Sequence, residues 1–259
     1  MKKTYLVFIT TISMLAACQH NRTGLFTVSG KVLHAPGNKL LLEELPFGGK
    51  NPIVVDSIAI RKDSSFELKS IAKEEGLYQL VIQDGPAILL INDASNVQVT
   101  LDVDNYKAYT TKGSEASTQL HEFLDTYSKE YQNLLTDIKQ NDSIQVAKTT
   151  DSIRTVIAQQ KDNQLQKINE LVSNTVTNSN SAALDYYLLG KSFATMQPVA
   201  IKKLSDASFN KFNTHKGLTY MKTITDGAFI KFMQQKKEIE KIIPKDTIKP
   251  IVDSTSSKQ

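Results

Sequence analysis

Short runs of alternating apolar and polar residues fill the first part of the chain, up to about residue 112. Such alternation predicts β-strands with one buried face and one solvated face. Turn-forming residues such as Pro36-Gly37-Asn38 and Asp84-Gly85-Pro86 separate the runs. The pattern predicts short strands at residues 26–32, 40–45, 53–60, 66–70, 77–83, 87–92, 97–103 and 109–112. Closely spaced strands of this kind favour an antiparallel β-sandwich or open barrel.

The hydrophobic period changes at Gly113-Ser114. From Leu120 to Ile138 the apolar residues recur mostly at three- and four-residue steps, which predicts a long amphipathic helix with Ser114 as its N-cap. We expect Asn141-Asp142-Ser143 to break this helix. The later pattern predicts a second helix whose apolar residues lie between positions 153 and 172, followed by a polar loop at 175–180. Three further helices are predicted at 182–193, 199–204 and 218–242. The fold class predicted from both parts is therefore α+β, a sandwich or barrel followed by an all-helical segment.

The N-terminus carries a targeting signal. Met1-Lys2-Lys3 is basic, and the mostly apolar stretch from Tyr5 to Met14 is too short to span a membrane. Leu15-Ala16-Ala17-Cys18 follows, which is typical of a bacterial lipoprotein signal whose cysteine is acylated before cleavage. The alternative is an ordinary secretory signal in which Cys18 is incidental. We favour lipidation of Cys18, which would leave a mature chain of 259 − 17 = 242 residues.

Lipidation of Cys18 would place the protein at a membrane, and the residues around Cys18 indicate which one. Several acyl chains, such as palmitate, hold a protein at a membrane much more firmly than one. Gln19 replaces the Asp that often retains bacterial lipoproteins in the inner membrane, so resemblance to that sorting rule favours the outer membrane. No acidic cluster follows Cys18, so we expect a periplasm-facing position. We accordingly expect a signal peptide at 1–17, a lipidated linker at 18–25, a sandwich domain at 26–113, a helical domain at 114–243 and a disordered tail at 244–259.

Charge and cysteine content limit the chemistry. The chain has 259 residues with 31 Lys and Arg against 27 Asp and Glu, and no basic block, so we expect no nucleic-acid partner. Cys18 is the one cysteine, and a disulfide or a zinc site built on cysteines needs more than one. Once Cys18 is acylated, the folded part has no thiol.

Several ordered landmarks resemble one lipoprotein family. They are Phe26-x-Val28-x-Gly30, Leu40-Leu41-Leu42, Val55-Asp56-Ser57, Phe66, Leu77-Tyr78 and Gly113-Ser114. Together they are similar to the N-terminal domain of unknown function of bacterial thiol–disulfide interchange lipoproteins. The resemblance implies a β-sandwich, a helical segment and then a thioredoxin-like domain. This sequence stops where that last domain would begin, and it has no Cys-x-x-Cys, so the redox activity of the family is not carried over.

Few residues suggest a reactive site. Asp56-Ser57 places an acid beside a hydroxyl, but a serine nucleophile needs a base, and no Gly-x-Ser-x-Gly elbow surrounds Ser57. The favoured interpretation is that Asp56 accepts backbone N–H bonds at the rim of a sheet. His34, His121 and His215 are widely spaced without a metal-ligand pattern, and we expect His121 to lie at the boundary of the helix stripe.

The remaining candidates favour structural roles as well. Gly113-Ser114 lacks the Lys and second Gly of a phosphate-binding loop, and a helix cap explains it. Aromatic side chains at helical spacing could stack on a sugar or peptide, but core packing is favoured; they are Tyr127, Tyr131, Tyr186 and Tyr187. Lysines near the end of the last helix could touch anionic lipid, but intervening glutamates favour a solvated face; they are Lys236, Lys237 and Lys241, with Glu238 and Glu240 between them. We predict no catalytic, cofactor-binding or metal-binding residue.

Two classes of function follow from this pattern. The first is a lipoprotein without enzymatic activity that binds an envelope protein or ligand. Within this class, the resemblance suggests an accessory partner of a separately encoded thioredoxin-like oxidoreductase. The second class is an enzyme whose site is assembled from scattered residues. The lack of any nucleophile–base or metal pattern favours the first class.

Overall fold

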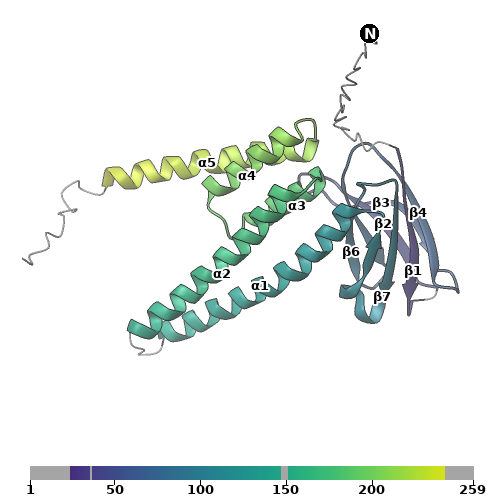
Figure 1. Cartoon of the computed structure of the whole chain (residues 1–259), viewed down its shortest axis with the longest axis horizontal. Helices are drawn as coiled ribbons and strands as arrows, with labels where there is room; N and C mark the ends of the chain where they lie inside the picture. The colour runs from purple at the N-terminus through teal and green to yellow at the C-terminus, as the bar shows by residue number, and fades with distance from the viewer. Residues whose placement is uncertain (1–23, 36, 147–150, 243–259) are drawn as a thin grey trace, which may run out of the picture.

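A computed structural model describes residues 24–35, 37–146 and 151–242 of the chain (Figure 1). The predicted signal peptide, Cys18 and the predicted tail lie outside the described residues. Strands occur at every position where the alternation predicts one. They are β1 (Gly24–Leu33), β2 (Lys39–Leu45), β3 (Ile53–Ala59), β4 (Ser65–Ala72), β5 (Leu77–Ile82), β6 (Ala87–Ile91), β7 (Asn96–Asp102) and β8 (Thr110–Lys112). A 3-10 helix, η1 (Val103–Ala108), precedes β8.

The strands form two four-stranded sheets packed face to face. Their orders are β4-β1-β7-β8 and β3-β2-β5-β6. Neighbouring strands are antiparallel except β1 and β7, which pair in parallel. The inward-facing residues of both sheets form one core, whose fully buried members include Phe26, Leu40, Leu68, Leu80 and Leu101. The predicted sandwich is therefore present, with one parallel pairing.

Gly30 is required where β1 meets β7. Its φ is +150°, and a Cβ atom at this position would lie 1.8 Å from the carbonyl oxygen of Val99, its partner in the register. No side chain fits there without moving the strand. The glycine landmark of β1 thus allows the close approach of the parallel pair.

The described chain after the sandwich is helical, which confirms the predicted α+β class. The helices are α1 (Glu115–Val146), α2 (Asp151–Asn178), α3 (Ala182–Ser192), α4 (Pro198–Lys211) and α5 (Lys216–Ile242). The predicted break at Asn141-Asp142-Ser143 is wrong, because α1 continues past it. The predicted loop at 175–180 is also mostly helical, because Val176 is buried in the helical core and extends α2 to Asn178. Low helix propensity of single residues is easily overridden by such packing.

The helix α4 is longer than predicted. The apolar pattern ended at residue 204, whereas the helix runs to Lys211 with Ser205 and Ser208 buried. A buried face made of serines carries no apolar signal, so the sequence pattern missed it.

A second core joins the sandwich to the helices. Leu77 of β5 and Ile91 of β6 pack with Leu120 and Phe123 of α1 and with Leu184 of α3. In Figure 1 two helical arms extend from the same side of the sandwich. We call α1 with α2 the first arm and α4 with α5 the second arm. Within the described residues, no helix combines the length and apolar character needed to cross a membrane.

Candidate functional site

Several polar side chains meet where the turn between β4 and β5 contacts the helices, and Glu75 lies in this turn. The Glu75 carboxylate accepts a hydrogen bond from the hydroxyl of Ser181 and another from the backbone N–H of Ala183 at 3.1 Å. Ser181 is itself the N-cap of α3, since its hydroxyl accepts from the N–H of Leu184 at 3.0 Å. A carboxylate at this position is favoured by the free N–H groups and the dipole of the helix. Glu75 therefore ties a sandwich turn to the start of α3.

His215, the residue immediately before α5, also contacts this junction. The N–H of Leu218 donates to His215 Nδ1 at 3.3 Å, so this nitrogen is the acceptor and Nε2 carries the proton. Nε2 then donates to the carbonyl oxygen of Glu75 at 2.8 Å. The imidazole also packs edge-on against Phe47, with ring centroids 4.9 Å apart. Nε2 thus joins the start of α5 to the sandwich, whereas Nδ1 caps the first turn of α5.

Asp185 is the most perturbed acid of this region. Its side chain is fully buried, and burial raises its pKa to about 7, although the nearby Ser208 and Ser179 hydroxyls and the Lys211 ammonium oppose the shift. Neither carboxylate oxygen makes a hydrogen bond of standard geometry with a described residue. A buried acid with such a pKa is a candidate proton donor. A substrate in solvent cannot reach it in this conformation, because no part of the residue is exposed.

A second polar network lies at the start of α1. The Ser114 hydroxyl donates to the Asp93 carboxylate and accepts from the N–H of Ser117 at 2.9 Å. Asp93 also accepts from the N–H of Ala116 at 3.0 Å, and Ser117 exchanges hydrogen bonds with the backbone of Ile91. Ser114 is the N-cap that the sequence predicts, and Gly113 before it has a φ of +85°. The network fixes α1 to the end of β6.

The structure brings His34 next to two acids that are far away in the sequence. His34 Nδ1 lies 2.6 Å from Asp102 and 3.4 Å from Asp104. The hydrogen bond from His34 lowers the pKa of Asp102, and the Asp102 carboxylate raises the pKa of His34. The three groups offer donor atoms within 4.8 Å of one another, at the exposed ends of β1 and β7. An ion pair between His34 and Asp102 accounts for this arrangement.

The other residues singled out in the sequence have structural contacts. The Asp56 carboxylate accepts from the N–H of Ser57 at 2.7 Å and from that of Lys69 at 2.8 Å, which is the favoured rim arrangement. His121 is half-buried and stacks on Tyr109, with ring centroids 4.0 Å apart. These contacts account for Asp56 and His121 without a ligand.

The four tyrosines of the sequence analysis pack as predicted, and the two lysines of that group whose side chains are described face solvent. Tyr127 stacks on Tyr131 at 5.7 Å within the helical core, and the Tyr186 hydroxyl accepts from the N–H of Gly48 at 3.0 Å. Burial raises the pKa of Tyr187 to about 12. Lys236, Lys237 and Glu238 are exposed on α5, whereas Glu240 and Lys241 are among the residues whose side chains are not described.

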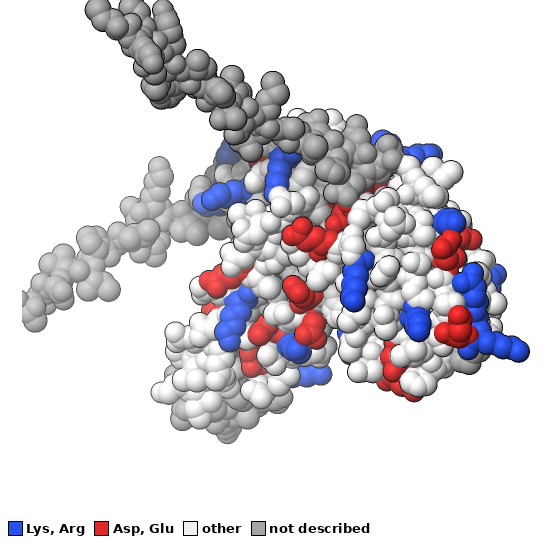
Figure 2. All heavy atoms as spheres, turned by 45° about the vertical axis from the view of Figure 1, so that its right-hand side comes forward, with Lys and Arg blue, Asp and Glu red and all other residues white. Residues whose placement is uncertain are grey.

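Figure 2 shows positive and negative side chains interspersed on the visible face of both modules, without one basic area.

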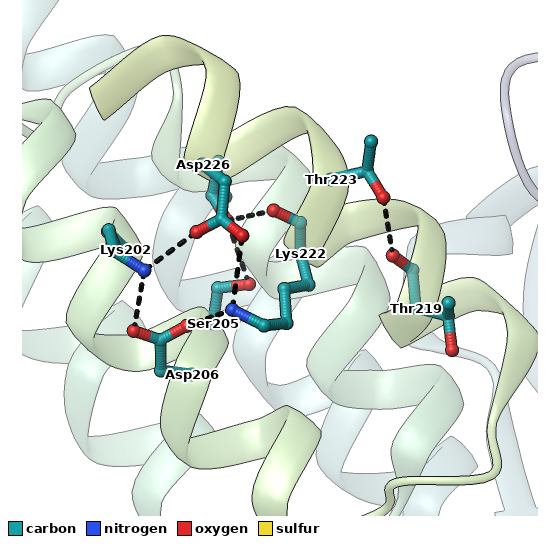
Figure 3. Close-up of polar contacts among 8 residues, drawn as sticks. Lys202, Ser205, Asp206, Thr219, Lys222, Thr223 and Asp226 are labelled. Carbon is teal, nitrogen blue, oxygen red and sulfur yellow. Dashed lines mark hydrogen bonds and ion pairs between the residues drawn. The ribbon is translucent and has the colours of Figure 1, made fainter. Parts of the chain in front are cut away.

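Four charged side chains alternate in sign between α4 and α5 (Figure 3). Lys202 lies 2.8 Å from Asp206 and 2.6 Å from Asp226, and Lys222 lies 2.8 and 3.1 Å from the same two acids. Beneath them the Thr225 hydroxyl donates to that of Ser205 at 3.1 Å. This charge ring fastens the two helices of the second arm to each other.

A shallow groove of about 390 Å³ follows the surface of α2. Its lining comes from Asp162, Leu165, Gln166, Asn169, Glu170, Ser173 and Asn174. The Asn169 side chain donates to the carbonyl oxygen of Thr195 at 3.3 Å, beside this groove. Since all of the lining residues belong to one helix, no second element closes over a molecule placed there.

Comparison with protein families identifies the first module. Residues 26–120 match the family model described as "Domain of unknown function (DUF4369)". We therefore refer to residues 26–120 as the DUF4369 domain, after the model that they match. The match confirms the expected N-terminal domain of unknown function, and it continues beyond the sandwich into α1 as far as Leu120. The DUF4369 region thus includes the Asp93–Ser114–Ser117 network. A search of curated proteins found no match to the chain.

The helices after the DUF4369 domain complete the candidate site. Sequence reasoning missed Glu75, Asp93 and Asp185, because their partners lie in other elements and form no local motif. For Asp185 the sequence offers one sign of burial, because this acid lies within the mostly apolar run from Ala182 to Leu189. The described residues that follow the DUF4369 domain are helical and form no thioredoxin-like sheet.

Proposed function

We propose that this protein is an outer-membrane lipoprotein, anchored through Cys18, whose periplasm-facing folded part is a binding module without enzymatic activity. The anchor is supported by the basic start, the short apolar stretch and Leu15-Ala16-Ala17-Cys18. The binding role is supported by the use of the buried polar groups. The hydrogen bonds of Glu75, Ser114 and His215 fix helices to the sandwich rather than line an open cleft.

The observation that carries the binding role is the second arm with its exposed apolar side chains. This arm projects from the sandwich, and α5 extends past the end of α4 (Figure 1). Ile230 is 55% exposed and Tyr220 is 43% exposed on α5, and Val199 is 50% exposed on α4. A contiguous exposed apolar area is typical of a protein interaction site, and we infer that the exposed apolar side chains of the second arm contribute to one. The charge ring keeps the two helices together, so the surface is preformed.

The proposed partner of this arm is an envelope protein. A photo-crosslinking amino acid placed at Ile230 of the full-length protein, expressed in its own cells, tests the proposal. We expect a crosslinked adduct of one defined mass at Ile230. The matched control is Lys203, an exposed polar position on α4, where we expect no adduct. Adducts that are absent at Ile230, or equal at both positions, contradict a specific binding arm.

A more specific version of this role is support of a separate thioredoxin-like lipoprotein. The DUF4369 domain favours it, because the landmark residues resemble the module that precedes a thioredoxin-like domain. An insulin-reduction assay tests this version. The protein should accelerate a thioredoxin-like lipoprotein from the same envelope and should leave an unrelated thioredoxin unchanged. Equal rates with and without the protein contradict the accessory role and leave the general binding role standing.

A further inference from the structure

Two large apolar side chains are exposed side by side at the end of the sandwich where β1 begins. Leu25 of β1 and Ile71 of β4 are direct partners in the antiparallel register. Leu25 is 58% exposed, and Ile71 is 81% exposed. A single exposed apolar residue is ordinary on a protein surface, but adjacent ones in register need a reason.

Polar pairs follow the apolar pair along the two strands. The next outward-facing pair along the two strands is Thr27 with Lys69, and the one after it is Ser29 with Glu67. Lys69 and Glu67 form an ion pair at 2.7 Å. The apolar pair is therefore confined to the end of the sheet from which β1 starts.

The first residues of β3 extend the apolar area around the edge of the sandwich. Ile53 is 53% exposed, and Val54 is 51% exposed. A tight turn, in which the N–H of Ser64 donates to the carbonyl oxygen of Arg61 at 2.9 Å, reverses the chain between β3 and β4. Across the two strands the Asp56 carboxylate accepts the N–H of Lys69 at 2.8 Å. Two residues beyond this contact, toward the start of β1, lie Val54 on one strand and Ile71 on the other. We call Leu25, Ile53, Val54 and Ile71 the tether-end patch.

The position of the patch relative to Cys18 points to its occupant. Cys18 is six residues before Gly24, the first residue of β1. Six extended residues span at most about 20 Å, so an acylated Cys18 holds Gly24, the neighbour of Leu25, within that distance of the bilayer surface. A short tether keeps the local concentration of lipid at the patch high, and weak apolar contacts are then sufficient for binding.

We propose that the tether-end patch rests on the phospholipid surface that holds the anchor. The proposal depends on the proposed lipidation of Cys18. Lys50 and Lys73 are exposed next to the patch residues in the sequence and would lie near anionic headgroups. With this end of the sandwich on the membrane, the lipid fixes the orientation of the module as well as its location.

Tryptophan fluorescence tests the proposal, because the chain has no native tryptophan. An Ile71→Trp variant of the lipidated protein is reconstituted into vesicles of phosphatidylethanolamine and phosphatidylglycerol that carry brominated acyl chains. The matched control is Leu33→Trp, since Leu33 lies on the same outward face of β1, about 26 Å from Leu25 at the usual strand rise. We expect a blue-shifted emission and several-fold stronger quenching at position 71 than at position 33.

Failure of the anchor and failure of the patch give different results. Mass spectrometry of the same sample shows whether Cys18 carries lipid, which tests the proposed function alone. If Cys18 is a free thiol, coupling it to a maleimide phospholipid restores the tether, and the quenching comparison is made on that protein. Equal quenching at positions 71 and 33 overturns the proposal. A blue shift at position 71 that needs an added envelope protein, and not lipid alone, also overturns it.

Discussion

Glu75 and Ser181 are 106 positions apart in the chain, yet the Ser181 hydroxyl donates a hydrogen bond to the Glu75 carboxylate. Because the carboxylate also accepts the N–H of Ala183, one side chain from the sandwich caps the helix α3. Hydrogen bonds to a charged group are stronger than those between neutral groups, and a helix N-terminus favours the negative charge. Glu75 therefore helps to hold α3 against the sandwich, together with the Asp93 network, His215 and the shared apolar core.

Replacing this acid is expected to weaken the junction. A Glu75→Ala change removes both hydrogen bonds and leaves the Ser181 hydroxyl and the N–H of Ala183 without their acceptor. We expect the free energy of unfolding, measured by urea titration, to fall by about 1–3 kcal/mol. Glu122→Ala, at an exposed position on α1, is the control and should change it by less than about 0.5 kcal/mol. Equal midpoints for the two variants would show that the cap contributes nothing.

Asp185 is expected to make stability fall as the pH rises. Its folded-state pKa is about 7, well above the value near 4 of an unfolded Asp, so the folded protein binds the extra proton between these values. The stabilisation is complete below about pH 4 and is lost as the pH rises through 7. An Asp185→Asn variant cannot lose a proton, so its stability should depend less on pH across this window.

The test compares how the free energy of unfolding of the wild type and of the Asp185→Asn variant changes with pH. Urea titrations at pH 5 and pH 8 should show that the wild type loses roughly 3 kcal/mol more than Asp185→Asn does, because most of the interval between the unfolded pKa near 4 and the folded pKa of about 7 lies in this window. Asp162→Asn, an exposed acid on α2, serves as the control for the loss of one charge. If Asp185→Asn and the wild type lose the same stability between the two pH values, Asp185 titrates normally in the folded state.

The strands could be predicted from the sequence, whereas the junction could not. Alternation along β4, for example, directly encodes which side chains face the core, so Phe66 and Leu68 are buried between exposed neighbours. The parallel pairing of β1 with β7 depends on which strands meet in space, and no local pattern records it. The same holds for Glu75 with Ser181 and for His34 with Asp102, whose partners are 106 and 68 positions away.

The apolar stripe of α1 gives a test of which leucines form the helical core. Leu124 and Leu135 belong to the apolar stripe, but the structure leaves both half-buried, while Leu120 and Leu134 are buried. Leu120→Ala should lower the free energy of unfolding by about 2–5 kcal/mol, because it opens a cavity between the sandwich and α1. Leu135→Ala should cost clearly less, as measured by thermal or urea unfolding. A larger loss for Leu135→Ala would contradict this packing.

The proposed anchor predicts a defined chemical change at Cys18. The mature protein should begin at Cys18 and carry acyl chains, which mass spectrometry of the membrane fraction detects as an added lipid mass. A Cys18→Ala variant should be misprocessed or released from the membrane, because no other residue of the signal offers a thiol. A Cys18→Ala protein that stays quantitatively in the outer-membrane fraction would exclude the lipid anchor.

The resemblance to thiol–disulfide interchange lipoproteins makes one activity worth measuring directly. Disulfide exchange requires a thiolate that attacks a disulfide and forms a mixed disulfide. Cys18 is the one cysteine of this chain, and once it is a thioether to lipid, as we propose, it can form neither species. The purified lipidated protein should therefore show no insulin reduction above the blank without protein, with a thioredoxin as positive control. Catalytic turnover by the protein alone would overturn the proposal that it is a binding module without enzymatic activity.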